Sequence, residues 1–212
     1  MDIELSDEQK AFVQVAQDFA PGVFAPQAAD WDENEIFPRD ALSQAGALGF
    51  CSLYASTAIG GLGLSRLDAS LVFEEMAAVD PSTTAFLTIH NMATWMVGQW
   101  GSHSLRQAWG ASLSSGEKLA SYCLTEPEAG SDAASLRTTA KLEHGRYVLN
   151  GSKAFISGAG ETDLLIVMAR TGAAGASGIS AFAVPGNAPG ITYGRKERKM
   201  GWNSQSTRAI TF

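Results

Sequence analysis

Residues 138–157 read TTAKLEHGRYVLNGSKAFIS, and this stretch decides the fold class of the chain. Its first six residues alternate between two sets of side chains, which is the two-residue period of a β-strand. A His-Gly turn follows, and a second apolar run ends at Asn150-Gly151, the dipeptide most typical of a two-residue hairpin turn. The pattern therefore predicts consecutive antiparallel strands, with residues 153–157 as the partner strand that follows Asn150-Gly151.

The strand pattern extends to the end of the chain. Further strands are expected at residues 164–169, 179–184, 191–193 and 208–212, separated by stretches rich in glycine, proline and alanine. Short strands joined by tight turns are typical of an antiparallel sandwich or a small barrel.

The first half of the chain shows a helical period instead. Ser6 and Gln9 form a capping box ahead of an apolar pattern that we expect to break at Pro21. Further helices are expected near residues 38–48, 65–79, 83–100 and 102–113. Helices followed by strands define an α+β chain, with an N-terminal all-α domain over residues 1–116 and an antiparallel β domain over residues 117–212.

Composition and charge restrict the class of protein. With 45% hydrophobic and 17% charged residues the chain is globular, and a formal net charge of −7 offers no electrostatic footprint for nucleic acid or anionic membrane. No metal-ligand cluster or signal peptide is visible, and the longest apolar run is far too short to span a membrane. Cys51 and Cys123 favour buried thiols in a reducing compartment over a disulfide, so we expect a cytoplasmic protein.

The richest candidate site is the segment YCLTEPEAGSD at residues 122–132. Gly130 permits a positive φ, so that backbone N–H groups at Gly130 and Ser131 would converge on an oxygen atom. The hydroxyls of Thr125 and Ser131 add rigid donors, which suits a polar heterocycle or a phosphate. The alternative is a solvated surface turn.

A second candidate segment is KAFISGAG at residues 153–160. Phe155 at the end of a strand can stack on a flat ring, and the hydroxyl of Ser157 can donate to the polar edge of that ring. The alternative is an ordinary core phenylalanine. His90 lies in an apolar helix, where a hydrogen-bonded core residue is the expected role.

Long motifs in a fixed order relate the whole chain to one family. GGLG at residues 60–63, YCLTEP at 122–127, GSD at 130–132 and NGSKAFIS at 150–157 together resemble the acyl-CoA dehydrogenase family from end to end. SRLD at 65–68, IHNM at 89–92, SGAGE at 157–161 and GWNSQ at 201–205 are most similar to the branch of that family that acts on isobutyryl-CoA in valine catabolism.

The resemblance implies an FAD cofactor, an acyl-CoA substrate, an electron-transfer flavoprotein as partner and a homo-oligomer. Thr125 would donate to the pyrimidine end of the flavin, Ser157 would reach its N5 atom, and Ser131 would also contact the acyl-CoA. The implied cofactor-binding residues are Tyr122, Cys123, Leu124, Thr125, Glu126, Pro127, Gly130, Ser131, Phe155, Ile156 and Ser157.

The same resemblance places the catalytic base, a glutamate, in a C-terminal helical bundle. This sequence ends at Phe212 in a predicted strand. We therefore expect the bundle to be absent, the β domain to be incomplete at its C-terminal end, and the chain alone to be inactive with weak FAD binding. The alternatives are a non-catalytic protein that binds flavin or CoA or serves in an interaction, and a flavin oxidase or monooxygenase on the same scaffold.

Overall fold

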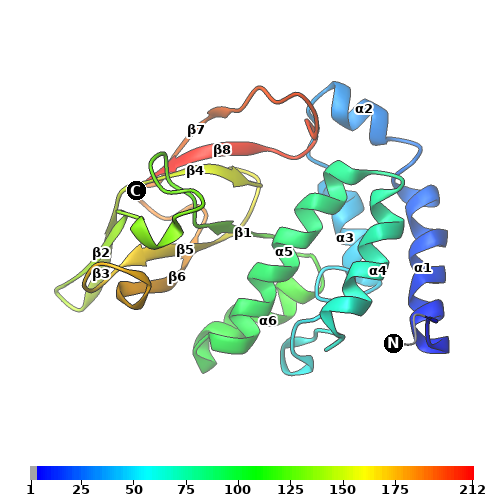
Figure 1. Ribbon diagram of the computed structural model, residues 1–212, viewed down its shortest axis with the longest axis horizontal. Helices are drawn as coiled ribbons and strands as arrows, with labels where there is room; N and C mark the ends of the chain where they lie inside the picture. The colour runs from blue at the N-terminus through cyan, green and yellow to red at the C-terminus, as the bar shows by residue number, and fades with distance from the viewer. Residues whose placement is uncertain (1–3) are drawn as a thin grey trace. The chain divides into compact units, whose positions relative to one another are not determined.

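The computed structural model describes residues 4–212, which form two compact units (Figure 1). The first unit runs up to Lys118 and also contains Lys199–Gln205. The second comprises Leu119–Arg198 and Ser206–Phe212. The helices precede the strands along the chain, so the α+β class is confirmed.

The first unit is helical. Its elements are α1 (Asp7–Val23), α2 (Ala28–Glu33), α3 (Arg39–Ala47), the 3-10 turn η1 (Thr57–Ile59), α4 (Arg66–Ala77), α5 (Pro81–Trp100) and α6 (His103–Ser114). The short helix α2 has no counterpart in the sequence prediction. Helix α1 packs against α4, α4 against α5, and α5 against α6 (Figure 1). None of the described helices combines the length and the apolar character needed to cross a membrane.

Local capping signals define where these helices begin. Ser6 and Gln9 form the expected capping box, and Ser65 forms a second one with Asp68. Ser102 accepts a hydrogen bond from the Leu105 amide at the start of α6. Each cap satisfies amides that the helix itself cannot pair.

The predicted break at Pro21 is wrong, because α1 continues through Pro21 to Val23. Pro21 falls in the last turn of α1, where it removes a single helical hydrogen bond. The amide of Phe24 still donates to the Ala20 carbonyl at 2.8 Å, and the rings of Phe19 and Phe24 pack edge to face. Burial of Ala20 and Phe24 therefore outweighs the local preference of proline.

The polar residues inside α5 belong to the core of the helical unit. His90 Nε2 donates to the Leu113 carbonyl at 2.9 Å, which confirms its expected role as a core residue. Asn91 is fully buried and fastens the loop after α3, accepting from the Leu53 amide at 2.7 Å and donating to the Phe50 carbonyl at 2.8 Å. These contacts leave neither side chain available to a ligand.

The segment Lys199–Gln205 packs with the helices although it connects two strands. Both carboxylate oxygens of Asp32 accept from Asn203, one from its backbone amide at 2.6 Å and the other from its side chain at 3.1 Å. The hydroxyls of Ser82 and Ser204 lie 2.5 Å apart. The sequence pattern places this segment in the β domain, since nothing local in it marks a helical partner.

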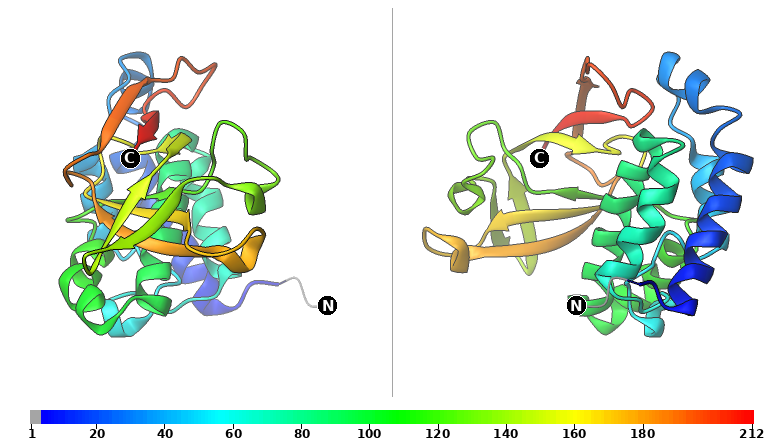
Figure 2. Two further views of the ribbon diagram at one scale, coloured as in Figure 1. Left: turned by 90° about the vertical axis from the view of Figure 1, so that its left-hand side faces the viewer. Right: turned by 45° about the vertical axis from the view of Figure 1, so that its right-hand side comes forward.

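The second unit consists of two sheets. One has the order β1-β5-β2-β3, with β6 also paired to β5, and the other has the order β4-β8-β7 (Figure 2). The strands are β1 (Ala120–Cys123), β2 (Thr139–Glu143), β3 (Arg146–Asn150), β4 (Ser152–Ser157), β5 (Leu164–Arg170), β6 (Ile179–Pro185), β7 (Thr192–Lys196) and β8 (Thr207–Thr211). Most pairs are antiparallel as expected, but both β1 and β2 run parallel to β5.

The hairpin predicted at Asn150-Gly151 is wrong. Strand β3 pairs with β2, whereas β4 pairs with β8 in the other sheet, so the chain changes sheets at Gly151. Gly151 has a φ of 153°, and a Cβ atom there would lie 2.6 Å from the Thr138 Cα. Close approach of two backbones, rather than a tight turn, accounts for the glycine.

Residues from both sheets form one apolar core. Its fully or nearly fully buried members are Cys123, Ile156, Ala159, Leu165, Val167 and Ile210. Cys51 and Cys123 are both buried free thiols, as expected.

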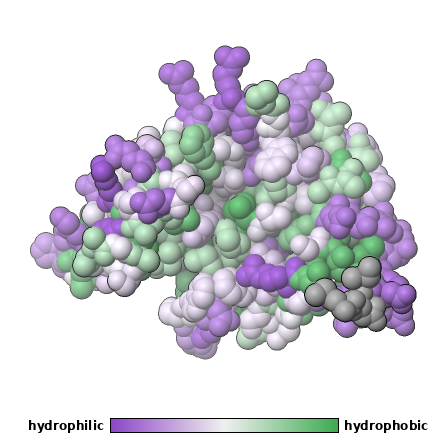
Figure 3. Space-filling model, in the orientation of Figure 1, coloured by the Kyte–Doolittle hydropathy of each residue, from purple (hydrophilic) through white to green (hydrophobic). Residues whose placement is uncertain are grey.

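On the face drawn in Figure 3, hydrophilic and apolar residues are interspersed.

Candidate cofactor site

The structure brings the two candidate segments together. The amide of Ala154 in β4 donates to the carbonyl of Thr125, just beyond β1, at 2.8 Å. The hydroxyl of Ser121 in β1 donates to the carbonyl of Ser157 at the end of β4, at 2.6 Å. Two stretches that lie about 30 residues apart in the chain are thus joined at two points.

Burial divides the sequence-predicted residues into two groups. Cys123 and Ile156 point into the core, so only their backbone groups can meet a ligand. Burial also raises the pKa of the Cys123 thiol to about 12, although the Lys153 ammonium opposes this, and the thiol therefore stays neutral. Tyr122, Thr125 and Ser157 are half-buried and can present their side chains.

Phe155 is exposed, whereas its neighbours Ala154 and Ile156 in β4 are buried. It is 66% exposed and has a φ of 56°, a left-handed conformation that is rare for an aromatic residue. The pairing of β4 with β8 shifts register between Lys153 and Ile156, so Phe155 lies in a β-bulge. The alternative of a core phenylalanine is wrong, and the bulge turns this ring outward. Strained backbone of this kind gathers at binding sites.

A tight turn follows β1. The amide of Glu126 donates to the Ala129 carbonyl at 3.0 Å, and the amide of Ala129 donates back to the Glu126 carbonyl at 3.1 Å. Gly130 lies just outside this closed turn and is not among the described glycines with positive φ. Gly130 therefore does not adopt the positive φ that a glycine permits. Ser131 is exposed, so its hydroxyl remains available to a ligand.

Glu126 is buried and fully engaged by donors. Its Oε1 accepts from Lys153 Nζ at 2.8 Å and from the Thr138 amide at 2.9 Å, and its Oε2 accepts from the Arg137 amide at 2.6 Å. Burial raises the pKa of this carboxyl, but the hydrogen bonds outweigh it and bring the pKa down to about 2. Glu126 is therefore ionised at neutral pH and is a poor proton acceptor.

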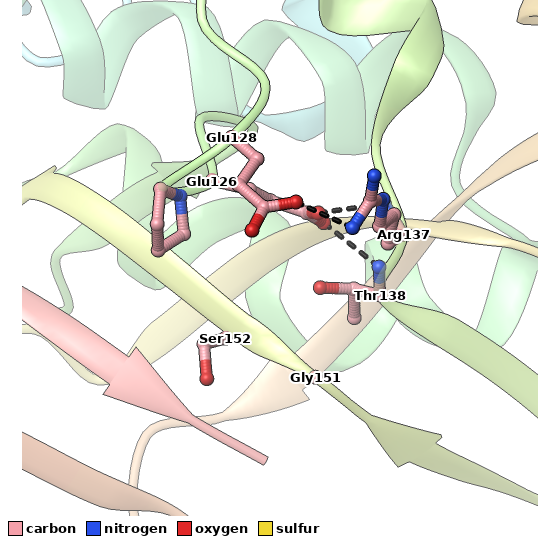
Figure 4. A pocket seen from close by; sticks show the side chains of 7 residues that line it. Glu126, Glu128, Arg137, Thr138, Gly151 and Ser152 are labelled. Atoms are coloured by element: carbon pink, nitrogen blue, oxygen red, sulfur yellow. Dashed lines mark hydrogen bonds and ion pairs between the residues drawn. The ribbon is translucent and has the colours of Figure 1, made fainter.

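A small cavity of about 230 Å³ lies beside Glu126 (Figure 4). It is lined by Glu126, Pro127, Glu128, Arg137, Thr138, Gly151 and Ser152. Glu128 and Arg137 form an exposed ion pair at its edge. At about 30 Å³ of liquid per molecule, this volume corresponds to about eight waters.

Arg170 fixes the turn that follows Ser131. From the end of β5 its guanidinium donates to the carbonyls of Ala134 at 2.8 Å and Leu136 at 3.0 Å, within and after the 3-10 turn η2 (Ala133–Ser135). It also donates to the carbonyls of Ala173 and Gly175. Sequence reasoning missed both Arg170 and Lys153. The available signal was a basic residue at a buried strand position, which requires a partner.

The available side chains fit a flat heterocycle with a polar edge. Tyr122 and Phe155 offer aromatic faces, and Thr125 and Ser157 offer hydroxyl donors from the two joined segments. A flavin has both a π-surface and a row of acceptor and donor atoms, so the donor set suits it.

Comparison with known proteins identifies the family. The model of the acyl-CoA dehydrogenase N-terminal domain matches residues 6–117, and the model of the acyl-CoA dehydrogenase middle domain matches residues 121–212. The chain belongs to the acyl-CoA dehydrogenase family. This confirms the resemblance drawn from the sequence motifs. Members of the family bind FAD.

Individual relatives agree with this assignment. Mitochondrial isobutyryl-CoA dehydrogenase of Bos taurus is 52% identical over 208 residues, covering 98% of this chain and 50% of the relative. The structure of butyryl-CoA dehydrogenase from Megasphaera elsdenii superposes with a TM-score of 0.89 at 33% identity, covering 100% of this chain and 57% of that one. PigA with FAD and proline superposes with a TM-score of 0.94 at 30% identity, covering 100% and 56%. The chain spans about half the length of the curated relatives it matches.

Proposed function

We propose that this chain supplies the flavin and acyl-CoA contacts of a dehydrogenase that oxidises a short, branched acyl-CoA of the isobutyryl type. The observation that carries the proposal is the joining of the two segments by the Ala154 amide and the Thr125 carbonyl, 2.8 Å apart. The bond supports the proposal because it joins the segment that carries Tyr122 and Thr125 to the segment that carries Phe155 and Ser157. The isobutyryl preference rests on the 52% identity to the bovine enzyme.

FAD, when bound, supplies the acceptor for the hydride that leaves the β-carbon of the thioester. The chain's own residues bind and orient. Thr125 and Ser157 donate hydrogen bonds to the polar edge of the ring, and Phe155 covers one of its faces. Ser131 contacts the acyl-CoA. These groups hold the reactants in the geometry that the reaction needs.

The α-proton of the thioester needs a carboxylate base with a raised pKa in a desolvated position. Glu126 is held by three donors and has a pKa of about 2, and Glu128 is exposed and paired with Arg137. We therefore assign the base to no residue of this chain. Electrons would pass to an electron-transfer flavoprotein, and the full-length protein would assemble as a homo-oligomer.

An FAD titration of the purified chain tests the proposal. Saturable quenching of FAD fluorescence with a shift of the visible flavin bands is the expected result. Thr125→Val should weaken FAD binding about fivefold, since one hydrogen bond contributes about 1 kcal/mol. Glu143→Gln in the exposed end of β2 is the matched control and should leave the affinity unchanged. A chain that neither quenches nor shifts FAD would contradict the proposal.

A second candidate function is flavin or CoA binding without turnover. The three hydrogen bonds to Glu126 and its low pKa favour it, because a carboxylate held in this way is a weak proton acceptor. The two functions separate in an assay with isobutyryl-CoA and an artificial electron acceptor. Binding without enoyl-CoA formation supports the second function, and turnover supports the first and refutes our assignment of the base.

A further inference from the structure

We propose that the buried ion pair between Lys153 and Glu126 is a positioning device, which sets the orientation of Thr125 and Phe155 toward the flavin. This inference rests on the proposed function. The pair links the two candidate segments through side chains, in addition to the backbone bond between Ala154 and Thr125.

The ammonium of Lys153 holds the backbone on both sides of Thr125. Its Nζ donates to the carbonyl of Leu124 at 2.9 Å and to Oε1 of Glu126 at 2.8 Å. The residues directly before and directly after Thr125 are thus bound to one cation. Because the Thr125 carbonyl is itself occupied by the Ala154 amide, the peptide units around Thr125 have little freedom, and the backbone that carries its side chain is held in place.

The carboxylate of Glu126 is anchored in turn. The amides of Arg137 and Thr138, at 2.6 Å and 2.9 Å, lead into β2. The Lys153 side chain is 0% exposed, so its charge requires this partner. One short network therefore ties the turn after β1 to both the start of β2 and the start of β4.

Lys153 also adjoins the strained residue. Phe155 lies two positions further along β4, inside the bulge and with φ at 56°. Such a conformation is strained and persists only where the surroundings determine it. Lys153 on one side and the core residue Ile156 on the other hold the ends of the bulge. We infer that releasing Lys153 lets Phe155 relax away from the ring.

A role in positioning is separable from a role in stability. Replacing a buried ion pair by apolar or neutral residues of similar size is often close to neutral for stability, whereas removal of one partner is strongly destabilising. The double variant Lys153→Met/Glu126→Gln removes both charges, and the new amide side chain keeps one oxygen, which can accept from one of the two amides of Arg137 and Thr138. It should unfold at nearly the wild-type temperature while the backbone around Thr125 loses its cation.

The experiment compares the wild type, this double variant and Val167→Ala, a core variant that leaves the network intact. Three quantities are measured: the thermal midpoint without flavin, the FAD dissociation constant, and the midpoint potential of the bound flavin. We expect the double variant to bind FAD about tenfold more weakly and with a shifted potential. Val167→Ala should lose thermal stability but keep the potential of the bound flavin. If the ion pair had a merely structural role, the double variant would show this same pattern.

Amide hydrogen exchange provides a readout that needs no flavin. The Ala154 amide should exchange faster in the double variant than in Val167→Ala, since its acceptor at Thr125 has been released. If the double variant does not fold cooperatively, Lys153→Arg takes its place, since it keeps both charges of the buried pair but changes the donor geometry at Leu124 and Glu126, with the same direction of change expected. Wild-type affinity and potential in these variants would overturn the inference. A wild type that binds no FAD would overturn the proposed function and the inference together.

Discussion

The left-handed backbone at Phe155 leads to a prediction about stability that inverts the usual order of alanine and glycine. In an ordinary strand position, glycine is less stable than alanine by about 0.5–1 kcal/mol because of its greater freedom in the unfolded chain. At Phe155 the φ of 56° penalises alanine but not glycine. We therefore expect Phe155→Gly to be more stable than Phe155→Ala.

The magnitude follows from two opposing quantities. Left-handed backbone costs a residue with a Cβ atom about 1–2 kcal/mol, and glycine escapes this cost. Subtracting the entropic penalty of glycine leaves an advantage of about 0.5–1 kcal/mol for Phe155→Gly over Phe155→Ala. The lost burial of the ring is nearly equal in the two variants, so it cancels in the comparison.

Val148 in β3 is the matched control, since it is 47% exposed and is not among the described residues with positive φ. There Val148→Gly should be less stable than Val148→Ala by about 0.5–1 kcal/mol. Urea and thermal unfolding of the four variants, followed by circular dichroism, give the double difference. One kcal/mol corresponds to about 2–4 °C for a chain of this size. Alanine equal to or better than glycine at position 155 would refute the argument from strain.

Gly151→Ala should destabilise the β unit by about 1–3 kcal/mol, because the new Cβ would lie 2.6 Å from Thr138 Cα. Urea unfolding measures this loss. A neutral result would show that the two backbones can separate. Glu126 has a pKa of about 2 in the folded state, against an ordinary value of 4.5, so its stabilisation is present above about pH 4.5 and is lost as the pH falls toward 2. Unfolding in urea across this pH range should show the loss in the wild type and less of it in Glu126→Gln; parallel curves would contradict the depressed pKa. Asn91→Ala should lower the free energy of unfolding by about 2–4 kcal/mol, since the Leu53 amide and the Phe50 carbonyl lose their buried partner. Asn34→Ala, at an exposed position, is the control and should lower it by less than about 0.5 kcal/mol in the same unfolding assay.

Signals that act over three or four residues were readable in the sequence. The caps at Ser6, Ser65 and Ser102 lie beside the amides they satisfy, so residue type and spacing were enough to locate three helix starts. The order of helices before strands, and the family to which the chain belongs, follow from patterns of this local kind. So does the list of residues around Thr125 and Phe155 from which the site is built.

Contacts between distant residues were not readable in the same way. Asn150-Gly151 has the composition of a hairpin turn, but the neighbour that decides its conformation is Thr138, which lies 13 residues earlier. The segment 199–205 bonds to Asp32, 171 residues away in the case of Asn203. In both cases the deciding partner leaves no mark on the adjacent sequence.

The amino-acid sequence by itself determined most of the helices and strands, and the hydroxyl and aromatic groups of the candidate site, because helix caps, strand periods and motifs depend on neighbouring residues. Only the tertiary structure decided that Phe155 turns outward, that Gly130 has an ordinary φ, and that Lys153 and Glu126 pair in the interior. The physical reason is that burial and pairing are properties of two chain segments at once. A lysine or a carboxylate takes its charge state and its role from the partner that folding brings to it.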